Sequence, residues 1–348
     1  LSFTRPLWFE ILAKEHKAAR EACVVVDQSS FAKLMVQGPD ACTMLQRLCT
    51  NDVDVTPGRI VYTAMCNERG GIESDLTVFR LDEDIFMLVT GTGQMIKDRD
   101  WLQRHFDDHR AVITDVTSSY AVLGVAGPKA VEMLSQACAE DMSFAAFPRY
   151  CHREIEIGYA RVRAARLSYT GEDGFELYIP SEFAAHVFET LFEAGDIFGL
   201  RNLGTLALTS LRVERGFCAW GHDITASDTP LEAGLGIAVK LDKAVDFIGR
   251  DALVRQQQNG LKPRLVYLAL QDADAYPIGA EPILYDGAPV GQITSAAFSH
   301  SIGRAICIGY VEHSPAEIST MAESGIFAVD IAGEVFLVDI NFSPLRDA

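Results

Sequence analysis

The segment LMVQGPDACTML at residues 34–45 returns in altered form as LGVAGPKAVEML at residues 123–134. Each copy has an apolar strand, a Gly-Pro step and the start of a helix. Glycine lets the chain turn sharply, and proline suits the first helical position because its φ angle is already fixed. The match predicts two copies of one strand-turn-helix unit, and so an α+β core with related halves. Two unrelated strand-helix joints with the same favourable start are the alternative.

The rest of the N-terminal part alternates between apolar strands and helices. A helix and a buried strand precede the first copy, within residues 6–30. The run Gly171-Glu172-Asp173-Gly174 predicts a hairpin turn between two further strands. The expected strands are residues 60–66, 75–80, 85–89, 160–168 and 175–179, and the expected helices are residues 94–106, 182–194 and 203–217.

A polar stretch, RQQQNGLKPR at residues 255–264, predicts a domain boundary. Beyond it, short apolar runs are broken by glycines at the spacing of a small all-β barrel or sandwich. We therefore expect a domain of two related subdomains over residues 1–256 and a β domain over residues 264–348. A chain of 348 residues is long enough for more than one core.

Charge and cysteine spacing narrow the classes of function. Lys plus Arg number 30 against 48 Asp plus Glu, a net charge of -18 that repels nucleic acid and anionic lipid. The eight cysteines form no C-x-x-C pair, and the histidines show no ligand spacing, so no metal site is expected. No apolar run is long enough for a membrane span. We expect a cytoplasmic protein if the source is bacterial, or a mitochondrial matrix protein if it is eukaryotic.

The segment LVTGTGQMIKD imitates a dinucleotide-binding loop. It has a strand, the glycines Gly91 and Gly93, and a following helix, but Ile96 stands where the third glycine is needed. We therefore reject nucleotide binding by this chain.

Asp75 is the first candidate for chemistry. In a strand beginning near Ile72, it lies on the face opposite Leu76 and Val78. Hairpin pairing across residues 67–71 brings Tyr62 within about one residue of it. A carboxylate beside an aromatic ring in a partly dry cleft can act as a general base or stabilise a cation. The alternative is a solvated acid at the end of a turn, and Glu73 has no assigned role.

Glu176 is the second candidate, in the run RLSYTGEDGFELYIP. It lies inside a strand, on the face opposite Phe175 and Leu177. A carboxylate there can accept two N–H groups from an aminopyrimidine ring, as it does from a guanidinium. The alternative is an outward-facing residue of a half-exposed sheet.

Arg212 is the third candidate. Helical spacing places it on an apolar stripe with Leu208 and Leu211, where an unpaired guanidinium is costly. It must find an acid, so a structural salt bridge and a ligand contact are both open. Trp220, just beyond the helix, is either an aromatic wall or part of the core.

These segments together resemble a known family. The runs YTAMCNERGGIESDLTV, YTGEDGFEL, SLRVERGFCAWGHD, TPLEAGL, FIGRDAL and VGQITSAAFSHSIGRAICIGYV are similar, in this order, to the aminomethyltransferase (glycine-cleavage T-protein) family. Within it, they look closest to the folate-binding half of sarcosine and dimethylglycine dehydrogenases. The resemblance runs over nearly the whole chain. It implies a clover-like α+β fold of three subdomains around tetrahydrofolate, the third being the C-terminal β-barrel.

The resemblance also implies roles for individual residues. Asp75 matches the family's essential aspartate near the reactive nitrogens of the folate, and Tyr62 matches an aromatic residue of the same cavity. Tyr169 and Glu176 match positions that hold the pterin, with Glu176 on its aminopyrimidine edge. Arg212 matches an arginine of the folate pocket.

The implied activity is capture of the methylene group of an oxidised N-methyl amine to give 5,10-methylenetetrahydrofolate. The substrate is then an N-methyl amine or its iminium, and the FAD belongs to a missing domain or a partner subunit. Ser74 and Gly91 stand where the T-protein usually has aspartate and asparagine, and both differences favour the dehydrogenase branch. A glycine-cleavage aminomethyltransferase, a folate-dependent O- or S-demethylase and a non-catalytic regulatory subunit are the alternatives.

Overall fold

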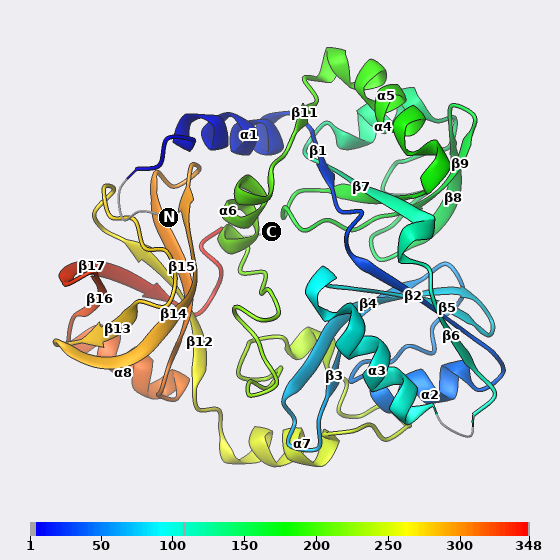
Figure 1. Ribbon diagram of the computed structural model, residues 1–348. Helices are drawn as coiled ribbons and strands as arrows, with labels where there is room; N and C mark the ends of the chain where they lie inside the picture. The colour runs from blue at the N-terminus through cyan, green and yellow to red at the C-terminus, as the bar shows by residue number, and fades with distance from the viewer. Residues whose placement is uncertain (1–4, 107–108, 347–348) are drawn as a thin grey trace.

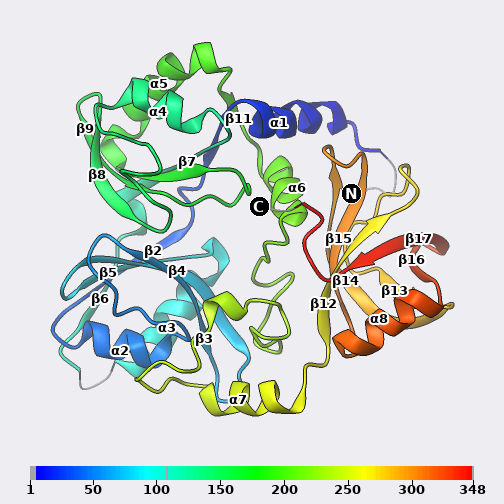
Figure 2. The ribbon, with the colours of Figure 1, turned by 180° about the vertical axis from the view of Figure 1, so that it is seen from behind.

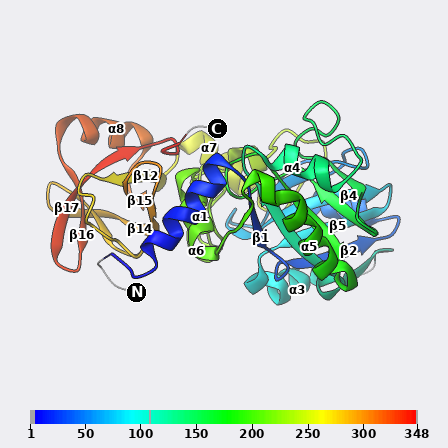
Figure 3. The ribbon, with the colours of Figure 1, turned by 90° about the horizontal axis from the view of Figure 1, so that it is seen from above.

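The computed structural model describes residues 5–106 and 109–346. Its ribbon forms three lobes around a common centre (Figure 1): two are built on a sheet with helices, and one is built on a barrel. The view from behind (Figure 2) shows the same three lobes, and the view from above (Figure 3) shows helix α1 (Phe9–Glu21) crossing between the barrel and an α+β lobe. The expected α+β fold with three subdomains is confirmed.

The sheet in the upper lobe of Figure 1, called here the upper sheet, combines the N-terminal strand with strands from the middle of the chain. Its order is β11-β1-β7-β10-β9-β8, and β1 pairs with β11 in parallel and with β7 in antiparallel fashion. The bounds are β1 Val24–Asp27, β7 Tyr120–Ala126, β8 His152–Ile157, β9 Ala160–Ala165, β10 Gly174–Pro180 and β11 Arg201–Asn202. Helices α4 (Ala130–Ala137) and α5 (Ala184–Gly195) pack on one face of this sheet, with Phe175 and Leu177 in the shared core.

The lower sheet is continuous in sequence. Its order is β3-β4-β5-β2-β6, and the helices of this lobe are α2 and α3. The bounds are β2 Ala32–Gln37, β3 Ile60–Cys66, β4 Ile72–Asp82, β5 Ile85–Thr90, β6 Val112–Asp115, α2 Ala41–Leu48 and α3 Met95–His105. A separate buried cluster that includes Phe79, Met87, Val122 and Tyr178 joins the two sheets. The inner faces of the two sheets therefore pack against each other.

The two copies of the repeated segment form one strand-turn-helix unit in each sheet, β2-α2 and β7-α4. Gly38 and Gly127 have φ angles of 137° and 127°, and a Cβ there would lie 2.2 Å and 2.5 Å from a backbone oxygen. The prediction for proline was wrong in position. Helix α2 has Asp40 as its N-cap, so Pro39 lies in the turn before the helix rather than at its first residue. The amide of Ala41 closes that turn on the carbonyl of Gly38.

The third lobe is a closed barrel with the strand order β12-β15-β14-β13-β16-β17, which decides between the expected barrel and sandwich. Helix α7 (Arg250–Asn259) lies along the connection into it, and α8 (Pro315–Ser324) begins with a capping box made by Ser314 and Glu317. The bounds are β12 Arg264–Leu270, β13 Pro282–Tyr285, β14 Ala288–Ser299, β15 Arg304–Val311, β16 Phe327–Ile331 and β17 Glu334–Asn341.

Several expected elements differ at their ends. Strand β4 is longer than the expected 75–80, because it pairs with both β3 and β5. Helix α6 (Thr205–Glu214) is shorter than the expected 203–217. Strand β9 ends at Ala165, so residues 166–173 form a wide loop instead of the expected tight hairpin, although β9 and β10 do pair.

In the described part of the chain, no helix has both the length and the apolar character needed to cross a membrane.

Candidate active site

A cavity of about 1030 Å³ lies between the two sheets and the segment that leads to the barrel. Strands β3, β4 and β5 line one side of it, and strand β10 with the loop 166–173 lines another. Residues 215–221, together with Pro344 and Arg346 of the C-terminal segment, line a further part of the wall. Drug-sized ligands occupy pockets of about 300–1,000 Å³, so this cavity has room for a large ligand and a small second one.

Asp75 and Tyr62 face this cavity from adjacent strands. The hydroxyl of Tyr62 donates a hydrogen bond of 3.1 Å to Oδ2 of Asp75. The predicted register was off by one position, since Asp75 pairs with Ala64 and Tyr62 with Thr77. Residues 62 and 64 share a face of the strand, so the long tyrosine still reaches the carboxylate diagonally. The strand alternation predicted for Asp75, opposite Leu76 and Val78, is confirmed.

Burial raises the pKa of Asp75 to about 6. The hydrogen bond from Tyr62 opposes this shift, and the negative charge of Asp98 adds to it. Asp98 lies behind the strand, where its Oδ2 accepts hydrogen bonds from Ser74 at 2.7 Å and Thr90 at 2.5 Å. At neutral pH Asp75 is therefore ionised, yet it is basic enough to accept a proton.

Glu176 occupies the inner face of β10, between two small residues. Its strand neighbours are Gly124 on β7 and Ala165 on β9, neither of which has a side chain large enough to cover the carboxylate. Tyr178 donates a hydrogen bond of 2.7 Å to Oε2. Burial raises the pKa of Glu176 to about 7, against the effect of that hydrogen bond. The predicted face, opposite Phe175 and Leu177, is confirmed because both pack in the outer core.

Aromatic side chains form walls of the same cavity. Tyr169 stacks on Phe217 with ring centroids 5.6 Å apart, and its hydroxyl donates to the carbonyl of Cys218 at 2.7 Å. Trp220 lines the cavity and donates to the carbonyl of Ile72 at 3.0 Å, so it is a wall and not only core.

Glu73 has a structural role that the sequence did not suggest. Its carboxylate forms an ion pair of 2.9 Å with Lys97, whose ammonium lies 4.5 Å from the centre of the Trp220 ring. Asn67 donates a second hydrogen bond to it at 2.9 Å. Glu73 therefore holds the lysine that fixes one aromatic wall.

Arg212 is not among the residues that line the cavity. Its guanidinium is buried and pairs with Asp223 at 2.5 Å, and it donates to Ser295 at 2.7 Å and to the carbonyl of Phe217 at 2.9 Å. The sequence left two roles open for Arg212, a structural salt bridge and a ligand contact. The observed contacts are those of a structural salt bridge. It ties α6 to the barrel and to the residue that stacks on Tyr169.

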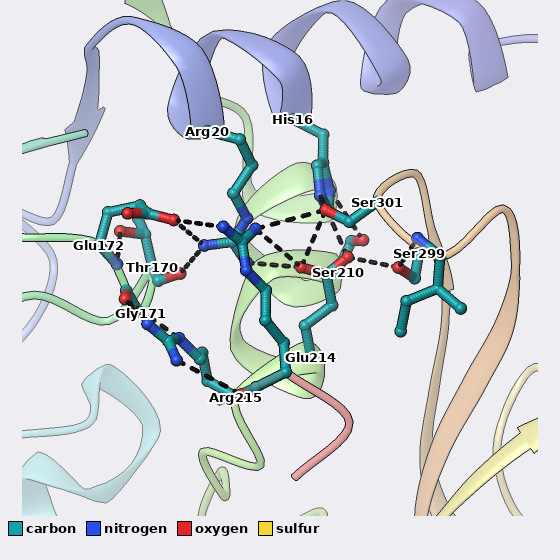
Figure 4. Close-up of polar contacts among 12 residues, drawn as sticks. His16, Arg20, Thr170, Gly171, Glu172, Ser210, Glu214, Arg215, Ser299 and Ser301 are labelled. Carbon is teal, nitrogen blue, oxygen red and sulfur yellow. Dashed lines mark hydrogen bonds and ion pairs between the residues drawn. The ribbon is translucent and has the colours of Figure 1, made fainter. Parts of the chain in front are cut away.

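The loop 166–173 is held from behind by a polar network centred on Glu214 (Figure 4). Glu214, whose side chain is 0% exposed, accepts from Arg20 at 2.6 Å and contacts His16 at 3.1 Å. It also accepts from Ser299 of the barrel. Arg20 reaches Glu172 of the loop at 2.7 Å. One buried acid thus connects α1, α6, the barrel and the cavity wall.

Glu214→Gln is expected to lower the free energy of unfolding by about 3 kcal/mol, because Arg20 would lose a fully buried partner. Burial alone would raise the pKa of Glu214, but His16, Ser299 and Arg20 lower it to about 2. The stabilisation is therefore present above the usual pKa of 4.5 and is lost as the pH falls towards 2. Thermal unfolding of the variant and of the control Glu21→Gln, whose pair with Lys17 is exposed, checks this. Equal unfolding temperatures for both variants would contradict the assignment.

Two buried glutamines in the cavity wall, Gln28 and Gln94, are not among the residues predicted from the sequence. Each is 6% exposed. Within the described chain, Oε1 of Gln28 and Nε2 of Gln94 have no hydrogen-bond partner. The oxygen of Gln94 would lie 2.5 Å from a Cβ at Gly91, so its side chain fills the space that the glycine leaves. The Gly91–Gly93 loop therefore lines the cavity, although its glycines do not form a dinucleotide motif. The signal in the sequence for Gln28 was a polar residue directly after a buried strand.

Three lobes around a cavity lined by two half-buried carboxylates define an aminomethyltransferase-type protein. Residues 1–243 match the family model of the GCVT N-terminal domain, and residues 264–345 match that of the glycine cleavage T-protein C-terminal barrel domain. The crystal structure of the glycine cleavage system aminomethyltransferase T from Bartonella henselae superposes with a TM-score of 0.85 at 27% identity, over 96% of this chain and 89% of that one. The chain belongs to the glycine-cleavage T-protein (aminomethyltransferase) family.

Two longer relatives cover 99% of the chain. The 4-methylaminobutanoate oxidase (formaldehyde-forming) of Paenarthrobacter nicotinovorans is 40% identical, and the mitochondrial pyruvate dehydrogenase phosphatase regulatory subunit of Mus musculus is 39% identical. The chain spans 41% of the length of each.

Proposed function

We propose that this chain binds tetrahydrofolate in the central cavity and transfers to it the methylene group of an oxidised N-methyl amine. The observation that carries the proposal is the pair of half-buried carboxylates, Asp75 and Glu176, that line one aromatic-walled cavity. Buried acids with raised pKa values in a cavity are common at binding and catalytic sites. The family of the chain makes folate the first ligand to test.

The residues of the cavity fit a reduced folate. The space around Glu176 suits an aminopyrimidine edge, whose two N–H groups match the two oxygens of one carboxylate. Tyr169 offers a ring face for the pterin or the aminobenzoyl group. Tyr62 orients Asp75 by its hydrogen bond. We propose that Arg212 acts on the ligand only indirectly, through Phe217 and the wall that it supports.

Bound tetrahydrofolate would supply the nitrogens N5 and N10, which take over the methylene carbon as the amine departs. The overall exchange converts an iminium and tetrahydrofolate into the amine, 5,10-methylenetetrahydrofolate and one proton. Asp75, with a pKa of about 6, can accept that proton and stabilise positive charge on the reacting groups. The apolar wall around it limits the water that would hydrolyse an iminium to formaldehyde.

The N-methyl amine is proposed from two observations. Ser74 replaces the first of the two adjacent aspartates expected in a glycine-cleavage enzyme, and its hydroxyl donates to Asp98. A relative that matches 99% of this chain is named as an oxidase of a methylamino compound. The oxidation itself needs a flavin, which we place in another domain or subunit. A glycine-cleavage activity and a folate-dependent demethylase remain the enzymatic alternatives, and a relative named as a regulatory subunit supports a non-catalytic one.

Calorimetric titration with tetrahydrofolate tests the proposal. Ionised Glu176 is the form that accepts two N–H groups, and its pKa is about 7. Affinity should therefore rise with pH through neutrality, by about tenfold between about pH 6 and about pH 8. Absence of binding at about pH 8 would overturn the proposal and favour a regulatory role. Detection of 5-methyl rather than 5,10-methylene product in an activity assay would identify a demethylase.

A further inference from the structure

Gln28 follows strand β1, which lies between β11 and β7 in the upper sheet, and it lines the wall of the cavity. Its backbone amide donates to the carbonyl of Val122 at 2.8 Å, which fixes the residue at the end of the strand pair. The side chain is 6% exposed, and Oε1 has no hydrogen-bond partner in the described chain. Burying an unpaired amide oxygen is costly, so a group held this way at a cavity wall indicates a ligand contact.

The amide lies directly over Gly124. A Cβ added at Gly124 would be 2.4 Å from Oε1 of Gln28 and 2.8 Å from a methyl group of Val26. Any larger residue would therefore push the amide away, which explains a glycine in the middle of a sheet. Gly124 is also the strand partner of Glu176. Cβ positions of such partners lie about 4.5–5.5 Å apart on the same face, so the amide and the carboxylate are neighbours.

We propose that Gln28 and Glu176 together recognise one edge of the ligand ring. Glu176 accepts two adjacent N–H groups, and the carboxamide of Gln28 makes a hydrogen bond to the next polar atom along the ring. A carboxamide both donates and accepts, so it matches either a ring carbonyl or a ring N–H beside the edge that Glu176 holds. This inference rests on the proposed function, and it assigns Gln28 to the pterin ring rather than to the aminobenzoyl-glutamate tail.

A purely structural role for Gln28 predicts a different outcome. A structural amide contributes stability through its partners, and its loss lowers the unfolding temperature. Oε1 of Gln28 has no such partner in the described chain, so an apolar side chain of equal length should leave the ligand-free protein as stable as before. A lower affinity without a lower stability therefore separates ligand recognition from packing.

Gln28→Met is the test variant, and Gln37→Met, at the exposed end of β2, is the matched control. Calorimetry at about pH 8 with tetrahydrofolate, and competition by 6-methyltetrahydropterin, which has the ring but not the tail, give the two affinities. We expect both to fall about tenfold in Gln28→Met, with no decrease in unfolding temperature. The control should bind both ligands with the affinity of the wild type. Gln28→Glu, a second variant of nearly the same shape, should weaken tetrahydrofolate binding more at about pH 8 than at about pH 6, because it sets a like charge beside Glu176.

Three outcomes would overturn the inference while the proposed function stands. Gln28→Met and Gln28→Glu could bind tetrahydrofolate as tightly as the wild type. Gln28→Met could weaken tetrahydrofolate but not 6-methyltetrahydropterin, which would place the contact on the tail. Both variants could lose stability in step with affinity. Failure of the wild type to bind tetrahydrofolate would instead overturn the proposed function.

Discussion

Glu176→Gln is expected to weaken tetrahydrofolate binding about a hundredfold without destabilising the protein. The variant loses the negative charge that accepts two N–H groups, and hydrogen bonds to a charged group are worth about 1.5–3 kcal/mol each. The oxygen of an amide can accept a hydrogen bond from only one of the two N–H groups of the ligand, and the amide's own N–H then faces the other N–H group. Calorimetry at about pH 8, where Glu176 is ionised in the wild type, measures the loss.

The stability of this variant has a predictable sign. The pKa of Glu176 is raised from 4.5 to about 7 in the folded chain, so the folded state retains a proton that the unfolded state releases. Stability of the wild type therefore falls as the pH rises through this window. Glutamine removes that dependence, so thermal unfolding at about pH 8 should occur at an equal or higher temperature.

Glu156→Gln is the control for Glu176→Gln, since Glu156 is an exposed residue of the same sheet. It should alter neither affinity nor unfolding temperature. If Glu176→Gln binds tetrahydrofolate as the wild type does, or if its affinity still rises with pH through neutrality, Glu176 does not hold the ring.

Asp75→Asn is expected to retain tetrahydrofolate within about threefold of the wild-type affinity but to lose about a hundredfold or more of the methylene-transfer rate. Asparagine keeps the hydrogen bond to Tyr62 but cannot accept the proton that the exchange releases. The rate is measured as amine-dependent exchange of a labelled methylene group on tetrahydrofolate, above the reaction without protein.

The pH profile distinguishes proton transfer from positioning. Because burial raises the pKa of Asp75 to about 6, the wild-type rate should increase with pH through that value, and the increase should be absent in Asp75→Asn. Asp82→Asn, at the exposed end of the same strand, is the control. An unchanged rate in Asp75→Asn would show that another group takes the proton.

Strand periodicity carried the prediction of the two carboxylates. In β4, Asp75 and Thr77 alternate with Leu76 and Val78. In β10, Glu176 lies between Phe175 and Leu177. Because successive side chains of a strand point to opposite faces, these sequences predict the side on which each carboxylate lies. Glycine spacing indicated the barrel, and the repeated segment indicated the strand-turn-helix unit that each of the other two lobes contains. These are local patterns that the chain repeats over short distances.

Such local patterns do not predict contacts between segments that are distant in the sequence. Arg212 pairs with Asp223, which lies in an irregular stretch with no period to place it. Gln28 and Glu176 line the same cavity because the strands β1 and β10 both pair with β7. Arg346 lines that cavity from the far end of the chain. Nothing near these residues in the sequence specifies which partner the fold brings to them.

The order of strands in the two sheets has a consequence for synthesis on the ribosome. The lower sheet uses residues 32–115 and can form as soon as that stretch has emerged. In the upper sheet, β1 lies between β7 and β11, so residues 24–27 gain their parallel neighbour only after residue 202 has been made. Such distant pairings form slowly and leave strand edges exposed meanwhile. During translation the edge of β1 that later pairs with β11 therefore stays unpaired after the lower sheet can form. Premature association between nascent chains would begin at this strand.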